Sequence, residues 1–106
     1  MEFQREVTVS GKVRREPRVA VDCMVKARES GQRETAAKLA DLTRLGGRVE
    51  LLSRLKIHDE IWIRLPGLSP IKAFVCWSQS FDAGLEFERP LHPAVFEHLL
   101  KTIKLS

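Results

Sequence analysis

The chain has no tyrosine, and its aromatic residues are limited to five Phe and two Trp in 106 residues. Proteins that hold single-stranded nucleic acids stack bases on aromatic side chains, so this scarcity argues against that class. No apolar run approaches the roughly 18 residues that a membrane-spanning helix needs. The first residues, MEFQRE, contain no apolar signal core. We therefore expect neither membrane insertion nor secretion.

Cysteine is also scarce, since the chain holds only Cys23 and Cys76. Two cysteines cannot build a disulfide framework, and no Cys or His pair has the spacing of a zinc site. The glycine-rich phosphate loop, the dinucleotide-binding glycine motif and the nucleophile elbow are all missing. We expect buried free thiols in a reducing cytoplasm, no metal or cofactor, and no enzymatic activity.

A chain of this length forms one domain with one small core. It is 43% apolar and 30% charged, which is ordinary for a folded soluble protein. The net charge is +4, and the excess lies in residues 1–56, which hold 13 Lys or Arg against 8 Asp or Glu. A basic half suggests an anionic partner, namely a nucleic acid, a phosphorylated small molecule or an acidic protein surface. A solvated surface of mixed charge would explain the same numbers.

Alternating apolar and polar residues predict a series of short strands. The clearest is 19–28, where every second residue is apolar and lies on one face of the strand. These residues are Val19, Val21, Cys23, Val25 and Ala27. Turn residues separate the segments, at 29–32, 41–47 and 80–83. The remaining strands are predicted at 34–40, 48–52, 60–65, 71–78 and 84–88.

The period changes after Pro93, which suits the first turn of a helix. Phe96, Leu99, Leu100 and Ile103 follow helical spacing and predict an amphipathic helix of about 10–12 residues. Serial strands with tight turns favour an antiparallel barrel or sandwich. The fold class is thus predicted to be mainly β, with a C-terminal helix packed against the sheet.

Two short segments attract functional interest, and the first is residues 13–18, which contain Arg14, Arg15 and Arg18. Three arginines within five positions repel one another unless they are solvated or face an anion. A guanidinium can hold phosphate oxygens or a guanine edge through two hydrogen bonds. The alternative is a basic lead-in to the first strand that faces solvent.

The second segment is residues 41–47, with Asp41, Thr43 and Gly46. Asp41 could accept hydrogen bonds from the N1–H and N2–H of a guanine, Thr43 could donate one, and Gly46 could let a base approach the backbone. The alternative is a turn whose Asp and Thr side chains bond to their own backbone.

Together, R-x-x-x-R and D-x-[ST]-x-x-G, about 20 residues apart, resemble the PilZ domain. The segments 61–65, 75–78 and 84–87 resemble further PilZ segments in the expected order. The resemblance implies a six-stranded antiparallel PilZ-type β-barrel with a C-terminal helix over residues 13–106. Residues 1–12, which have a mixed pattern, are predicted to form an N-terminal arm before it. The resemblance also implies a receptor for the bacterial second messenger cyclic diguanylate (cyclic di-GMP).

The resemblance assigns ligand-binding roles residue by residue. Arg14 and Arg18, with Arg15 between them, match positions that hold phosphates and guanine edges. Asp41, Thr43 and Gly46 match the turn that cradles a guanine. Trp77 falls where some members place an aromatic residue near the ligand. Thr43 stands where the family more often has Ser, and Leu45 where many members have Gly. If position 45 needs a positive φ, Leu45 costs about 1 kcal/mol or more. Val13, just before the motif, favours a single bound ligand, and Trp77 is equally explained by packing.

The function predicted from these residues is cyclic di-GMP binding by a small stand-alone cytoplasmic adaptor. Ligand binding would switch the N-terminal arm and signal to an unknown downstream protein, and no DNA partner is expected. One alternative is a PilZ-fold protein-interaction module that binds no nucleotide. Another is a small basic barrel that binds single-stranded nucleic acid.

Overall fold

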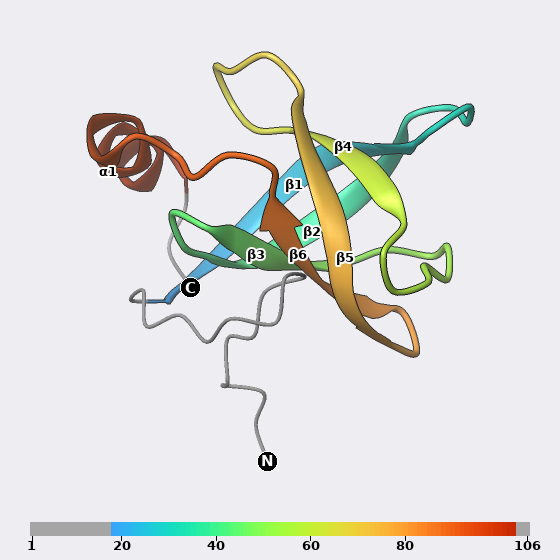
Figure 1. The fold of residues 1–106 in the computed structure, drawn as a ribbon. Helices are drawn as coiled ribbons and strands as arrows, with labels where there is room; N and C mark the ends of the chain where they lie inside the picture. Colours follow the sequence, from blue (N-terminus) through green and yellow to red (C-terminus); the bar gives the residue numbers. More distant parts are fainter. Residues whose placement is uncertain (1–17, 104–106) are drawn as a thin grey trace.

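The computed structural model describes residues 18–103, which form six strands followed by one helix (Figure 1). Neighbouring strands are antiparallel and close in the order β1-β2-β3-β6-β5-β4. The predicted six-stranded barrel with a C-terminal helix is therefore confirmed. The elements are β1 (Val19–Glu29), β2 (Thr35–Leu42), β3 (Gly46–Glu50), β4 (Glu60–Arg64), β5 (Ile71–Gln79), β6 (Asp82–Phe87) and α1 (Pro93–Thr102).

The barrel interior is filled by the apolar members of the alternating strands. A period of two places every second side chain inside, and a slip of one residue would bury charges in their place. Strand β4 shows this clearly, because Ile61 and Ile63 are fully buried while Glu60 and Arg64 are exposed. The largest fully buried side chains are Leu39, Leu42, Ile61, Ile63, Leu65, Leu99, Val21, Val49 and Val75.

Register shifts interrupt the alternation in three strands. They lie between Ala20 and Cys23 in β1, between Leu39 and Asp41 in β2, and between Val75 and Trp77 in β5. A bulge adds a residue to one strand, sharpens its bend and changes which face the next side chain takes. In β2 the bulge leaves Asp41 half-buried while Leu39 is fully buried and Leu42 points inward.

Helix α1 packs its apolar stripe against the barrel, as predicted. Leu99 is completely buried, and Ile103, just beyond the helix, is nearly so. The helix begins with Pro93, and the Nδ1 atom of His92 accepts a hydrogen bond from the Ala94 backbone N–H at 3.0 Å. This cap satisfies one of the backbone donors that a helix start leaves open.

Several predicted boundaries were wrong. The turn predicted at 41–47 is shorter, because β2 continues to Leu42 and β3 begins at Gly46. The turn predicted at 80–83 also ends early, since β6 begins at Asp82. Cys23 and Cys76 are free thiols, as predicted, but both are half-buried rather than buried. Cys23 stays in the inward-facing series of β1 with Val21 and Val25 but is only partly buried against the core, and Cys76 follows the buried Val75 at the register shift of β5.

The N-terminal arm predicted for residues 1–12 lies outside the described residues, as do Val13, Arg14 and Arg15. Arg18 is described and directly precedes β1.

Candidate functional site

Thr43 organises the turn between β2 and β3. Its Oγ1 atom accepts hydrogen bonds from the backbone N–H groups of Leu45 at 2.9 Å and Gly46 at 3.1 Å. Its own backbone N–H donates to the Gly46 carbonyl at 2.8 Å. These contacts match the alternative in which the turn bonds to its own backbone. The turn is therefore complete without a ligand, and a hydrogen bond from the Thr43 hydroxyl to a ligand stays a prediction.

Gly46 is required by strand packing. A Cβ atom built at this position would lie 1.8 Å from the carbonyl oxygen of Leu85 on β6. Gly46 is buried and pairs with Glu86 in the β3–β6 ladder. The absence of a side chain thus lets two backbones approach closely, which explains a glycine here independently of any ligand.

Leu45 has no left-handed backbone strain. Within residues 18–103, His58 and Ser80 are the non-glycine residues with a positive φ. Leu45 therefore lies outside the region that favours glycine, and the cost of about 1 kcal/mol that a positive φ would impose does not arise.

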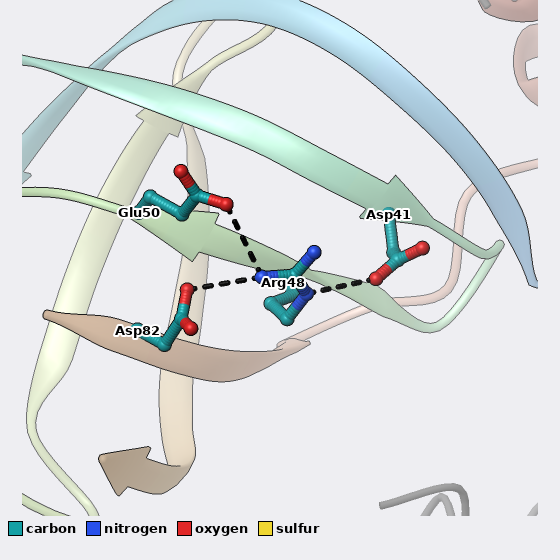
Figure 2. Close-up of polar contacts among 4 residues, drawn as sticks. All are labelled: Asp41, Arg48, Glu50 and Asp82. Carbon is teal, nitrogen blue, oxygen red and sulfur yellow. Dashed lines mark hydrogen bonds and ion pairs between the residues drawn. The ribbon is translucent and has the colours of Figure 1, made fainter. Parts of the chain in front are cut away.

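Asp41, at the end of β2, is held by an arginine that sequence reasoning missed. Arg48 on β3 donates from Nε to Asp41 Oδ2 at 2.9 Å (Figure 2). Its Nη1 atom lies 3.0 Å from Asp82 Oδ1 on β6 and 3.3 Å from Glu50 Oε2. We call these four residues the Arg48 cluster. The hydrogen bond to Asp41 is the largest cause of a raised pKa at Arg48.

A simple signal in the sequence would have found Arg48. A hairpin that turns at residues 43–46 pairs Leu42 with Gly47 and Asp41 with Arg48. Directly opposed residues on antiparallel strands place their side chains on the same face. The predicted turn at 41–47 hid this pairing, because it removed Asp41 from the strand.

Arg18 lies beside the turn. It directly precedes Val19, which pairs with Leu42 at the end of β2, one residue before Thr43. The structure thus brings the last arginine of R-x-x-x-R next to the D-x-[ST]-x-x-G turn. Arg14 precedes Arg18 by four residues, a length of chain that spans about 14 Å at most.

Trp77 belongs to the same transverse row of the barrel as Asp41. Asp41 opposes Arg48, Arg48 opposes Gly84, and Gly84 opposes Trp77. Trp77 is half-buried, and its indole lies over Gly84, where a Cβ would be 2.0 Å from Nε1. Three strand spacings separate Asp41 from Trp77, about 14 Å. Packing over Gly84 accounts for Trp77, and a ligand contact by its indole stays a prediction.

The turn is also tied to the segment that leads into α1. Arg44 Nε donates to the Leu91 carbonyl at 3.0 Å, and the Leu91 N–H donates to the Arg44 carbonyl at 2.8 Å. The Phe87 N–H donates to the Leu45 carbonyl at 2.7 Å. The helix accordingly lies at the barrel end that holds the β2–β3 turn (Figure 1). A shift of the turn would therefore also move the segment that connects β6 to α1.

Neither a clustered metal site nor a membrane-spanning helix occurs within residues 18–103. No group of three or more His, Cys, Asp or Glu side chains there is arranged to hold a metal ion. In the same part of the chain, no helix has the length and apolarity to cross a bilayer.

The assembled site offers complementary chemistry on one surface. Asp41 presents a fixed acceptor, Arg18 a cation beside the turn, and Trp77 an aromatic ring in the same row. A carboxylate accepts from neighbouring N–H donors of a planar base, while a guanidinium binds phosphate oxygens. Such a surface can bind a molecule that combines a donor-bearing ring with an anionic group.

Comparison with known proteins identifies the family. The model of the PilZ domain family matches residues 12–104, which is most of the chain. No curated protein matches the sequence. PilZ domains are nucleotide-binding receptor modules that generally lack enzymatic activity, and the family is one of cyclic di-GMP receptors. The match agrees with the closed six-stranded barrel and C-terminal helix, and the chain belongs to the PilZ domain family.

Proposed function

We propose that this PilZ domain binds cyclic di-GMP between R-x-x-x-R and the β2–β3 turn. The observation that supports this most directly is the register of β1 against β2. Val19 opposes Leu42, so Arg18, the last arginine of R-x-x-x-R, lies beside the turn at the start of β1. Arg18 is therefore close to a turn that comes more than 20 residues later in the sequence, which supports one shared site.

Each group of residues has a distinct role in the proposal. Arg14 and Arg18, with Arg15 between them, bind the two phosphates and a guanine edge. The Asp41 carboxylate accepts from the N1–H and N2–H of one guanine. Thr43 and Gly46 shape the turn beneath that base. Trp77 lies beside the ligand.

The proposed signal is a change in the N-terminal arm. Three arginines within five positions repel one another until an anion lies between them. Two or three charge-assisted hydrogen bonds, each contributing about 1.5–3 kcal/mol, offset the entropy of fixing residues before Arg18. The fixed arm and the altered charge form a surface that a downstream cytoplasmic protein recognises, an order–disorder switch.

One alternative has an observation in its favour. The turn satisfies its own hydrogen bonds through Thr43, and Asp41 already has a partner in Arg48. A PilZ-fold module that binds a protein and no nucleotide would have the same contacts. Recovery of the same partner with and without cyclic di-GMP would favour this alternative.

Isothermal titration calorimetry with pure cyclic di-GMP tests the proposal. We expect saturable binding near one ligand per chain, and loss of the signal in an Arg14→Ala, Arg18→Ala double variant. Arg54→Ala is the control, because Arg54 stacks on Phe81 at 5.5 Å, away from the turn. Absence of heat up to about 100 μM ligand, well above the micromolar range of a physiological receptor, would reject the proposal.

A further inference from the structure

The Arg48 cluster places one guanidinium among three carboxylates on the outer face of the barrel. Asp41 comes from β2, Arg48 and Glu50 from β3, and Asp82 from β6 (Figure 2). Arg48 is about one-third exposed, and Asp41 is the most buried of the three acids, with 20% of its side chain exposed. The cluster is thus a partly desolvated network in which geometry matters.

We propose that Arg48 is a positioning residue that orients the Asp41 carboxylate for guanine and thereby sets the base selectivity of the site. This inference rests on the proposed function and extends it to a residue outside both PilZ motifs.

The first argument is geometric. Arg48 opposes Asp41 in the β2–β3 ladder, and its Nε–H donates to Oδ2 alone. Within residues 18–103, Oδ1 of Asp41 accepts no hydrogen bond, and Figure 2 shows this oxygen turned away from Arg48. A carboxylate has about four acceptor positions, so one bond to Oδ2 restricts its rotation and leaves Oδ1 open. The parallel N1–H and N2–H donors of a guanine suit such a fixed carboxylate.

The second argument is electrostatic. Without Arg48, the carboxylates of Asp41, Glu50 and Asp82 would face one another with no cation in the cluster, and like charges at short range repel. Asp41 would then turn away from its neighbours, and its plane would no longer be defined. A lysine at position 48 would keep the charge but lose the planar Nε–H donor that sets the orientation of Asp41.

The test compares two ligands that differ only in the N2 amino group of each base. Cyclic di-inosine monophosphate lacks the N2 amino group of guanine but keeps both phosphates and the N1–H. One hydrogen bond to a charged acceptor gives about a tenfold preference or more. We expect the wild-type protein to bind cyclic di-GMP at least tenfold more tightly than the inosine analogue.

In Arg48→Lys, we expect that preference to fall below about threefold, mostly through weaker binding of cyclic di-GMP. Arg64→Lys is the matched control, because Arg64 on β4 donates from Nε to the Glu34 carboxylate at 3.2 Å in a more exposed pair outside the cluster. It should keep the wild-type preference. A merely structural role for Arg48 would weaken both ligands equally, and an unchanged preference in a folded Arg48→Lys protein would overturn the inference.

A second measurement applies to the wild-type protein and avoids any folding defect of the variant. The side-chain Nε–H signals of Arg48 and Arg64 are followed by NMR during titration with cyclic di-GMP. A shift of the Arg48 signal with no shift of the Arg64 signal is expected, and binding without an Arg48 shift contradicts the inference. Absence of binding to either dinucleotide would instead reject the proposed function itself.

Discussion

Replacing Gly46 with alanine should destabilise the fold strongly without any involvement of a ligand. The added Cβ would lie 1.8 Å from the Leu85 carbonyl oxygen, and the atom it meets belongs to backbone. An ordinary carbon–oxygen contact needs about 3.3 Å, so β3 and β6 must separate locally by about 1.5 Å. No side-chain rotation can relieve the overlap.

The magnitude follows from overpacking and from stretched ladder hydrogen bonds. Inserting a methyl group into a packed site costs about 1–3 kcal/mol, and each weakened backbone hydrogen bond adds about 1 kcal/mol. Gly46 pairs with Glu86 and its neighbour Gly47 with Leu85, so at least two rungs are affected. We expect Gly46→Ala to lower the free energy of unfolding by about 3–5 kcal/mol, a large share of a small domain's stability.

Urea unfolding followed by circular dichroism, in the absence of nucleotide, measures this loss. Gly31→Ala is the matched control, because Gly31 has φ +79° but no atom within 4 Å of the added Cβ. It should cost about 1–2 kcal/mol, from backbone strain alone. A Gly46→Ala protein whose free energy of unfolding lies within 1 kcal/mol of wild type would refute the packing argument. It would instead favour a ligand contact as the reason for glycine at position 46.

Three further predictions concern the turn and the thiols. Thr43→Val should cost about 1–3 kcal/mol in urea unfolding because two backbone donors lose their acceptor, whereas Thr43→Ser should stay close to wild type. Arg44→Ala removes the hydrogen bond to the Leu91 carbonyl, so amide exchange at Leu91 should accelerate while the barrel stays folded. Burial raises the pKa of the Cys76 thiol to about 11 from an ordinary 9.0. In a Cys23→Ser background at pH 8, alkylation of Cys76 should therefore be about a hundredfold slower in the folded than in the urea-unfolded protein. The folded state binds this proton more tightly, so its contribution to stability is complete below pH 9 and is lost as pH rises towards 11. Equal alkylation rates would contradict the burial of Cys76.

Most of the fold could be predicted from the sequence because the barrel depends on short-range alternation. Strand β4 shows period two in Ile61 and Ile63, both fully buried. The change to helical spacing after Pro93 located α1, which ends at Thr102. These patterns report which face is buried, and one buried face is enough to fix both element type and register.

The bulges and the glycine positions could not be predicted. Bulges in β1, β2 and β5 depend on how neighbouring strands curve to close the barrel, which no local pattern encodes. The sequence predicts Gly46 as a turn residue, yet it is the first residue of β3 and lies against Leu85 of β6, 39 positions away in sequence. Glycine is required at such positions because two backbone segments that are distant in the sequence approach each other closely.

The candidate site also contains residues that the sequence predicts and a residue that it does not. Asp41, Thr43 and Gly46 stand out through their spacing, whereas Arg48 is found only once the hairpin register pairs it with Asp41, and its further partner Asp82 lies 34 positions away. Thr43 was assigned two possible roles, and the structure places its oxygen in the turn. Spacing can find residues that act together locally, but a network built across three strands needs the pairing register.

The most direct test of the account is an amide NMR titration of the complete chain with cyclic di-GMP. We predict saturable shifts concentrated in residues 13–18 and 41–48, with smaller shifts at 87–92 through the Arg44–Leu91 hydrogen bonds. The β3–β4 loop around Arg54 should not respond. Shifts confined to another face of the barrel, or none at saturating ligand, would contradict the claim that the arginine segment and the β2–β3 turn together bind one guanine dinucleotide.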